Sequence, residues 1–283
     1  MSVKLIQDRL DSYHCQSHLE QEHAIREIMQ EVVLAALGRT EFFKDALFQG
    51  GTCLRIIYGL NRFSEDMDYI LKETNPDFEL QPHLRAVSDE LKAYGCDIAV
   101  VDRSRAGVAV RKAFLKDDSL GKILRLQYAD ASGPARQIRI RLEVDTNPPS
   151  GSRVEIKYVD FPFVSSVAVQ DKPSLFAGKL HALLCREYVK GRDWYDFLWY
   201  TSQRIGVNYG FLSAALAQQG PWRQQEIHVD AQWCRTHLED RINSVDWAAA
   251  RDDVRRFIKP SEYPSLDLWS RELFRSRLPR IEG

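Results

Sequence analysis

The spacing of apolar and polar residues predicts that the first part of the chain mixes helices with extended segments. Apolar residues recur every three or four positions over residues 18–37, which predicts an amphipathic helix. A second helix with the same spacing is predicted after Asn75-Pro76; it runs to about Tyr94 and stops at Gly95. A short helical turn is expected over residues 40–45, whereas residues 1–17 show at most a weak helical pattern.

The middle of the chain is strand-like. Short apolar runs are separated there by turn-forming residues, which predicts hairpins and a mostly antiparallel sheet. The predicted strands cover residues 97–102, 107–115, 122–128, 137–145 and 154–159, and residues 161–169 add further extended chain.

After Pro173 the periodicity becomes helical. Candidate helices cover residues 174–188, 192–203, 209–218, 230–241, 245–258 and 266–278. We therefore predict an α+β domain over residues 1–170 and an all-helical domain over residues 171–283.

Composition limits the class of protein. The chain has 283 residues, of which 44% are hydrophobic. The sequence contains no run of about 18 apolar residues, so it predicts no membrane span. Its first residues lack the apolar core of a signal peptide. The five cysteines are scattered without metal-ligand spacing. These features predict a cytoplasmic protein with reduced thiols and no membrane partner.

Charge is balanced overall but not locally. The net charge is −1, yet ten Lys and Arg face three Asp between Arg103 and Arg141. Such a run is typical of a solvated face, and it also suits contact with an anionic substrate.

The most informative stretch runs from Phe48 to Leu71. There, Gly50-Gly51-Thr52 opens a predicted helix, and the glycines would let backbone N–H groups approach an anion. If residues 64–71 are extended, Ser64, Asp66 and Asp68 share one face. Carboxylates suit Mg²⁺, so the combination predicts a site for a metal-bound phosphate. It is not a P-loop, because no Gly-Lys-Ser/Thr follows.

A further carboxylate is expected from residues 138–145. Apolar residues alternate there with polar ones, as in a half-buried strand, and Glu143 and Asp145 share the polar face. Two-metal phosphoryl transfer uses such an additional carboxylate. Glu143 is favoured, because Asp145 precedes Thr-Asn-Pro-Pro and is placed to cap that turn.

The last candidates lie in residues 179–197. Lys179, Arg186 and Lys190 have helical spacing, and Asp193 lies with Asp196 at the start of the next predicted helix. Taken alone, both patterns are common on solvated surfaces. His181 is interpreted as structural, since the sequence places no nucleophile beside it.

Together these motifs resemble a known family over roughly residues 25–200. Its pattern is matched by the Gly-Gly-Thr segment with Arg55 and Tyr58, by Arg62-Phe-Ser-Glu-Asp-Met-Asp68, by Leu142-Glu-Val144, by Lys179-Leu-His-Ala-Leu, and by Arg192-Asp-Trp-Tyr-Asp196. The chain is similar to the AbiEii/AbiGii-type nucleotidyltransferase toxins, which belong to the polymerase-β-like nucleotidyltransferase superfamily and have MenT-type relatives.

The resemblance implies a polymerase-β-like domain with a mixed or antiparallel sheet, followed by helices, and the transfer of NMP from an NTP with release of pyrophosphate. It assigns NTP binding to Gly50, Gly51, Thr52, Arg55, Ser64 and Lys179. It assigns Mg²⁺ or Mn²⁺ to Asp66, Asp68 and Glu143, with Asp145 left as the alternative to Glu143. The implied catalytic residues are Asp66, Asp68, Glu143, Lys179 and Asp193.

Some relatives modify the 3′ end of tRNA and are countered by a cognate antitoxin. We therefore expect a toxin that modifies tRNA, with its site between the two domains and an RNA-facing surface over residues 103–141. Two alternatives stay open: transfer to a small molecule or a protein, and a non-catalytic module that binds a nucleotide or a partner.

Overall fold

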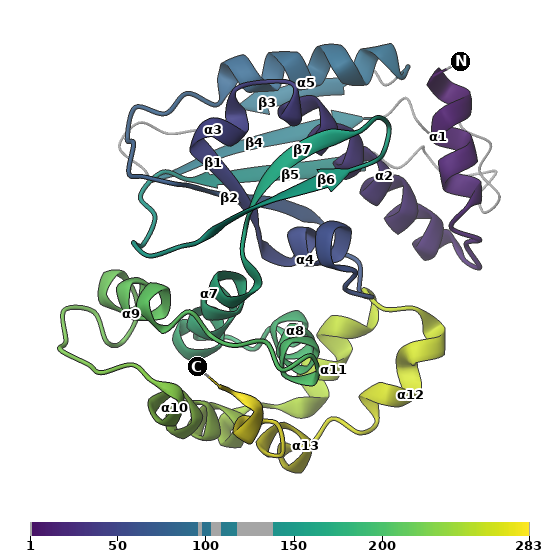
Figure 1. Ribbon diagram of the computed structural model, residues 1–283. Helices are drawn as coiled ribbons and strands as arrows, with labels where there is room; N and C mark the ends of the chain where they lie inside the picture. The colour runs from purple at the N-terminus through teal and green to yellow at the C-terminus, as the bar shows by residue number, and fades with distance from the viewer. Residues whose placement is uncertain (1, 96–97, 103–108, 118–137, 283) are drawn as a thin grey trace. The chain divides into compact units, whose positions relative to one another are not determined.

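The computed structural model describes residues 2–95, 98–102, 109–117 and 138–282 (Figure 1). The chain forms two compact units, each described by itself. Unit 1 comprises residues 1–59, 63–148 and 155–169, and unit 2 comprises residues 60–62, 149–154 and 170–283. Two short segments of unit 2 thus come from the part of the chain before residue 170. The predicted domains 1–170 and 171–283 stay a prediction.

Unit 1 is built on a mixed β-sheet. Its seven strands in the described residues lie in the order β3-β4-β5-β2-β1-β7-β6. The pairs β1–β7 and β2–β5 are parallel, whereas β1–β2, β3–β4 and β4–β5 are antiparallel. The strands are β1 (Ala46–Gln49), β2 (Asp66–Leu71), β3 (Ile98–Asp102), β4 (Val110–Asp117), β5 (Ile138–Asp145), β6 (Val154–Val159) and β7 (Ser165–Gln170).

Four of the five described helices of unit 1 pack on this sheet, and the first packs on the second. The five helices are α1 (Ser2–Asp11), α2 (His18–Gly38), α3 (Phe42–Asp45), α4 (Gly50–Tyr58) and α5 (Gln81–Ala93). Helix α2 packs against α5 and β5, and α4 packs against β2. The segment Val32–Leu37 is apolar on every side, which explains why the second half of α2 is buried all round.

Unit 2 is helical. It contains α7 (Lys172–Cys185), α8 (Gly191–Ser202), α9 (Tyr209–Gln218), α10 (Ala231–Ser244), α11 (Trp247–Arg255), α12 (Tyr263–Leu266), α13 (Arg271–Arg275) and 3₁₀ turns at Pro260–Glu262 and Leu278–Arg280. Five of these helices begin at a side chain that accepts a backbone N–H of the first turn: Asp171, Asn208, Asp230, Asp246 and Ser270.

Aromatic packing joins the helices of unit 2. Trp247 stacks on Phe274 at 4.1 Å between ring centroids, and Trp194 meets both rings edge-on. Helix α8 approaches α11 closely at Gly191, where a Cβ would overlap the carbonyl of Ala250. Glycine is therefore required at this helix crossing.

The structure confirms the predicted α+β fold class, with corrections in detail. The sheet is mixed, and three of its five described strand pairs are antiparallel, in agreement with the predicted mixed or antiparallel sheet. The helix expected over residues 266–278 is wrong as a single element, because α12 ends at Leu266 and Ser270, in extended backbone, caps a new helix. Residues 1–17 include a regular helix, α1. The strand predicted over residues 122–128 lies outside the described residues.

Within the described chain, none of the helices has the length and apolar character needed to cross a bilayer.

Candidate active site

The start of helix α4 is built around Gly50. This residue has φ +78°, and a Cβ on it would lie 2.5 Å from the Asp68 Oδ2 atom. Glycine is therefore required twice, once for the left-handed backbone and once for the close approach. The first N–H groups of any helix lack intrahelical acceptors, and the N-cap residue Gln49 makes no side-chain cap. The predicted anion-binding helix start thus lies directly against a predicted metal ligand.

Two of the predicted NTP-binding side chains hold the fold. The Thr52 side chain is fully buried and its hydroxyl donates a hydrogen bond to the Asp66 carbonyl, which ties α4 to β2. The Arg55 guanidinium donates to Glu27 at 2.8 Å and lies over the Phe63 ring. In the structure both side chains hold helix α4 against its neighbours. Their contact with the nucleotide stays a prediction.

The acidic residues follow the predicted alternation. Along β2, Asp66 and Asp68 are half-buried, whereas Met67 and Tyr69 are buried on the other face. Strand β5 runs parallel to β2, and its register places Glu143 directly beside Asp68. Three carboxylates from two strands therefore share one face of the sheet.

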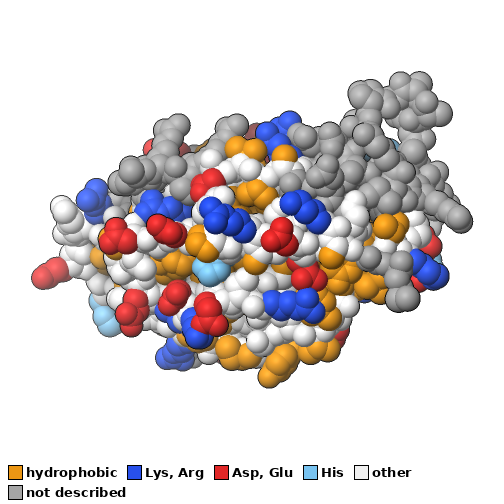
Figure 2. All heavy atoms as spheres, turned by 90° about the horizontal axis from the view of Figure 1, so that it is seen from above, with side chains coloured by type: hydrophobic (Ala, Val, Ile, Leu, Met, Phe, Trp, Pro, Cys, Tyr) orange, Lys and Arg blue, Asp and Glu red, His pale blue; other side chains and the backbone are white. Residues whose placement is uncertain are grey.

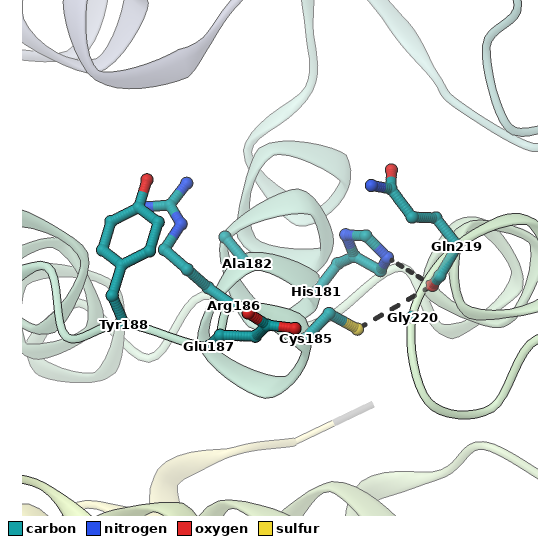
Figure 3. Close-up of a pocket in the computed structure, with 8 residues that line it drawn as sticks. All are labelled: His181, Ala182, Cys185, Arg186, Glu187, Tyr188, Gln219 and Gly220. Carbon is teal, nitrogen blue, oxygen red and sulfur yellow. Dashed lines mark hydrogen bonds between the residues drawn. The ribbon is translucent and has the colours of Figure 1, made fainter.

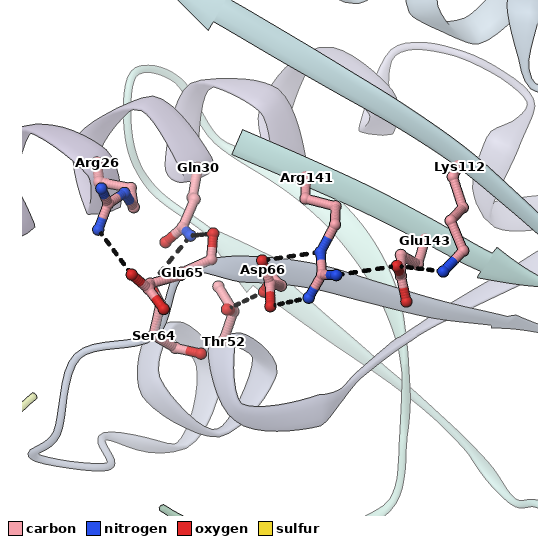
Figure 4. A network of polar contacts seen from close by, with 9 residues as sticks. All are labelled: Arg26, Gln30, Thr52, Ser64, Glu65, Asp66, Lys112, Arg141 and Glu143. Carbon is pink, nitrogen blue, oxygen red and sulfur yellow. Dashed lines mark hydrogen bonds and ion pairs between the residues drawn. The ribbon is translucent and has the colours of Figure 1, made fainter. Parts of the chain in front are cut away.

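Two cations lie among these carboxylates (Figure 4). Arg141 donates two hydrogen bonds to Asp66, with its Nε 3.0 Å from Oδ1, and its guanidinium is 3.3 Å from Glu143. The Lys112 ammonium is 2.9 Å from the same Glu143 oxygen. The hydrogen bonds to Asp66 raise the pKa of Arg141. We call Asp66, Asp68, Glu143, Arg141 and Lys112 the strand cluster.

Asp145 has a different role in the structure. Its carboxylate accepts a hydrogen bond from the backbone N–H of Asn147 at 2.9 Å, so it caps the turn after β5. Burial raises the pKa of Asp145, which makes the charged form harder to maintain. This geometry favours Glu143 as the third carboxylate of the proposed site.

The donor chemistry of the strand cluster suits a hard divalent cation, since all three candidate ligands are carboxylates. As the side chains lie, however, the described residues contain no group of three acidic, His or Cys side chains that could hold one ion. Arg141 interacts instead with two of the three carboxylates, Asp66 and Glu143. A metal would bind Asp66 only after Arg141 has moved.

Ser64 lies on the segment that leads into β2, and this segment is held by helix α2. The Gln30 side chain donates to the carbonyls of Ser64 and Glu65 at 3.1 and 3.0 Å. Arg26 pairs with the Glu65 carboxylate at 3.6 Å. The backbone is thus fixed just before the acidic strand.

Unit 2 contains a second charged cluster, which we call the buried network: Arg62, Lys179, Arg186, Asp193 and Asp196. The Lys179 ammonium is 2.6 Å from Asp193 and 2.8 Å from Asp196. Arg62 donates two hydrogen bonds of 2.6 Å to Asp196, and Arg186 pairs with Asp193. Lys179 lies on α7, and Asp193 and Asp196 lie on α8. Arg186 is the C-cap residue of α7, and Arg62 comes from the segment between α4 and β2.

Burial and pairing shift the protonation of this network. Burial raises the pKa of Asp193, but Lys179 and Arg186 outweigh it and hold that pKa at about 2. For Lys179 the effect of burial is to lower the pKa, but Asp193 and Asp196 outweigh it, so that the pKa of Lys179 is raised. The predicted catalytic pair Lys179 and Asp193 is therefore an ion pair near neutral pH.

Sequence reasoning missed Arg62 and Asp196 as partners. Both occurred in the matched motifs, but no role was assigned to them. They are 134 positions apart in the chain, so no local pattern indicates their contact.

The expected RNA-facing surface over residues 103–141 lies largely outside the described residues. In its described part, Arg111 donates to the Phe78 carbonyl, and Lys112 and Arg141 belong to the strand cluster. On the face in Figure 2, basic and acidic side chains of the described residues are interspersed. The RNA-facing role stays a prediction.

Comparisons with known proteins show which family and which solved structures the chain resembles. A family model described as "Nucleotidyl transferase AbiEii toxin, Type IV TA system" matches residues 32–272. None of the curated proteins compared matches the chain.

The solved structures that match the chain include the following three. A putative nucleotidyltransferase from Helicobacter pylori is 16% identical, with a TM-score of 0.50, and the match covers 91% of this chain and 96% of that one. JHP933 from Helicobacter pylori is 15% identical with a TM-score of 0.50, covering 91% and 94%. The toxin MenT4 from Mycobacterium tuberculosis H37Rv is 15% identical with a TM-score of 0.48, covering all of both chains.

Proposed function

The chain belongs to the AbiEii nucleotidyltransferase toxin family, and from that premise we propose that it transfers NMP from an NTP to the 3′ end of a tRNA. Nucleotidyl transfer itself follows from the family. The choice of tRNA as acceptor and the need for Mg²⁺ or Mn²⁺ are parts of the proposal.

One observation carries the proposal. Gly50 lies against Asp68 at the start of α4, which brings helix N–H groups and a carboxylate to the same point. Helix N-termini favour phosphate, whereas a lone carboxylate repels it. The helix N–H groups and the carboxylate can bind the same ligand when a cation accompanies the phosphate, as in a metal-bound NTP.

The carboxylates of the strand cluster are the proposed metal ligands. Asp66, Asp68 and Glu143 would hold the ion after Arg141 has left Asp66. When bound, the ion would neutralise charge on the phosphates. Arg141, once released, is a guanidinium within reach of the same place and suits a phosphate oxygen.

The remaining roles belong to the protein's own groups. Gly50, Gly51 and Thr52 would present backbone N–H groups to the triphosphate, with Ser64 beside them. Lys179 and Asp193 are the other proposed active-site residues. Because Asp193 holds Lys179 in a fixed ion pair, Lys179 would meet the phosphates as a positioned charge. Catalysis would then rest on positioning and charge stabilisation.

The type IV toxin–antitoxin description of the family implies a cognate antitoxin for this chain. We propose an antitoxin protein encoded beside the toxin. Co-expression of the neighbouring gene should then relieve growth arrest caused by the toxin.

The direct test incubates the purified protein with tRNA and each α-³²P-labelled NTP in Mg²⁺. We expect label on the tRNA 3′ end, and Asp68→Asn should lower the rate at least 100-fold. Label on a small molecule or protein, and none on tRNA, would overturn the tRNA acceptor but keep nucleotidyl transfer.

A matched pair of variants tests the third carboxylate. Glu143→Gln should reduce label transfer about as strongly as Asp68→Asn does. Asp145→Asn retains an oxygen that can accept the Asn147 N–H and should retain most of the transfer. The reverse ranking would assign the role to Asp145.

A further inference from the structure

Unit 2 contains a pocket of about 530 Å³ at the C-terminal end of α7. Figure 3 shows Ala182 as its floor, with Tyr188 and Arg186 on one side and His181 and Gln219 on the other. The volume falls within the roughly 300–1,000 Å³ typical of small-molecule sites. None of the roles assigned above uses this pocket.

One wall of the pocket is held firmly by α7. The Gln219 carbonyl accepts a hydrogen bond from His181 Nε2 at 3.1 Å and lies 3.9 Å from the Cys185 sulfur. Gly220 follows with φ +110°, and a Cβ there would lie 2.5 Å from that sulfur. Glycine thus allows the loop after α9 to pack directly on the helix.

The opposite wall is also fixed. Arg241 of α10 donates to the carbonyls of Leu183 and Arg186, at 3.1 and 2.7 Å. The Arg186 side chain pairs with Asp193 in the buried network and lies 5.2 Å from the centroid of the Tyr188 ring. The Tyr188 side chain itself is 65% exposed. A rigid site therefore presents one open aromatic face.

The pocket offers both donors and acceptors with little net charge. A carbonyl oxygen can only accept, so His181 Nε2 carries a proton. Burial lowers the pKa of His181, which leaves Nδ1 as an acceptor near neutral pH. Among the lining residues the formal charges cancel, because Arg186 is basic and Glu187 is acidic. A phosphate would find little positive potential here, and a purely apolar group would leave these polar atoms unsatisfied.

We propose that this pocket binds a nucleobase, stacked on Tyr188 and hydrogen-bonded at the His181 side. Nucleobases are planar, neutral and rich in both donors and acceptors, and they stack on exposed aromatic side chains. Lys179 lies one helical turn from Ala182 on the same side of α7. A base on this floor would be joined through its sugar to a phosphate near Lys179.

The inference rests on the proposed function, because it takes Lys179 as a phosphate contact. The base could be that of the NTP or the 3′-terminal base of the acceptor RNA, and the same chemistry binds both. Separate measurements on the two substrates distinguish these sources.

Two substitutions test the pocket at residues outside the buried network. Tyr188→Ala removes the stacking face, and Ala182→Leu fills the floor with a good helix former. We expect either one to raise the KM for one substrate at least tenfold while changing kcat less than threefold. Tyr188→Phe should recover the lost affinity. Ala249→Leu, at an exposed position of α11, is the matched control and should change neither KM.

Direct binding is measured with 2-aminopurine, whose fluorescence is quenched by stacking. The two probes are 2-aminopurine riboside triphosphate and a short RNA ending in 2-aminopurine. Quenching of either probe by the wild type, lost in Tyr188→Ala, supports the pocket and identifies the source of the base. Label transfer by the wild type, with unchanged KM values and unchanged quenching in both variants, would overturn it. Quenching without any label transfer would support the pocket and overturn the proposed function.

Discussion

The strand cluster and the buried network are both built from acidic and basic side chains, but they differ in charge balance and in exposure to water. In the strand cluster three carboxylates face two cations, and the Asp66 and Arg141 side chains are 26% and 39% exposed. In the buried network three cations face two carboxylates, and the Arg62 and Asp196 side chains are 3% and 0% exposed.

Exposure to water determines how much free energy it costs to break the ion pairs of each cluster. Exposed ion pairs are screened and contribute little stability, so their partners can be exchanged at small cost. A buried ion cannot lose its partner without a large desolvation penalty. We therefore infer that the strand cluster can rearrange around an incoming ligand, whereas the buried network keeps Lys179 in one fixed position.

The strongest test of this difference removes the most buried carboxylate. Asp196→Ala deprives Arg62 and Lys179 of a shared partner inside unit 2 and should lower its unfolding free energy by about 3–5 kcal/mol. All 6 tryptophans lie between residues 194 and 269. Denaturant titration followed by tryptophan fluorescence therefore reports on unit 2.

The matched variant in the strand cluster is Asp66→Ala. It should change stability by less than about 1 kcal/mol, as measured by far-UV circular dichroism in the same titration. Equal losses in the two variants would show that burial does not distinguish the clusters.

A second prediction concerns Gly50 beside the strand cluster. Gly50→Ala places a methyl group against Asp68 in addition to straining a left-handed backbone, and should abolish most label transfer. Gly59 has nearly the same φ, +75°, but a Cβ there meets nothing within 4 Å. Gly59→Ala therefore measures backbone strain alone.

The difference between these two alanine variants isolates the contact with Asp68. We expect Gly50→Ala to be less stable than Gly59→Ala by about 1–3 kcal/mol, the usual range for overpacking. If the two variants unfold at the same denaturant concentration, then Asp68 is free to move away from the helix start.

The acid stability of unit 2 provides a third test. The pKa of Asp193 is about 2 in the folded protein, below the value of about 3.9 for an unfolded chain. Asp193 therefore stabilises the fold above pH 4, and this contribution of about 2 kcal/mol is lost as the pH falls toward 2. Tryptophan-monitored denaturation at pH 5, 4, 3 and 2.5 should show the decline.

Asp193→Asn is the control for this titration. The variant should be less stable than the wild type at pH 6, and its stability should depend less steeply on pH between 4 and 2. An identical slope in wild type and variant would mean that another carboxylate determines acid unfolding.

The smallest expected effects on stability belong to the strand cluster, and Arg141→Ala is a second such variant beside Asp66→Ala. The ion pair between Arg141 and Asp66 is partly exposed, so its loss should lower the free energy of unfolding by less than about 1 kcal/mol. The same variant should bind Mn²⁺ more tightly, because Asp66 loses a competing cation. Calorimetric titration with Mn²⁺ alone measures this, and weaker binding would instead make Arg141 a group that helps to assemble the site.

Much of the candidate site could be predicted from local patterns. A glycine pair before a helix and an alternation of polar and apolar residues depend on neighbours in the chain, so Gly50, Asp68 and Glu143 could be selected. The preference for Glu143 over Asp145 also came from a local feature, the turn that follows Asp145.

Partners from distant parts of the chain could not be predicted in this way. Arg141 and Asp66 are 75 positions apart, and they meet only because β2 and β5 pair in parallel at one register. A shift of one residue would turn Arg141 to the other face of the sheet. The same limit applies to Thr52, because no local pattern indicates that its hydroxyl donates to the Asp66 carbonyl. Its predicted role in NTP binding stays a prediction.

By itself, then, the sequence determined most of the helices and strands, the fold class and which side chains are chemically suited to phosphate and metal. Those properties depend on the periodicity of the backbone and on functional groups that are visible residue by residue. Only the tertiary structure decided which charges are paired and which are buried, because pairing and desolvation depend on segments brought together by folding. For this protein, that separates a strand cluster able to exchange partners from a network that holds Lys179 in place.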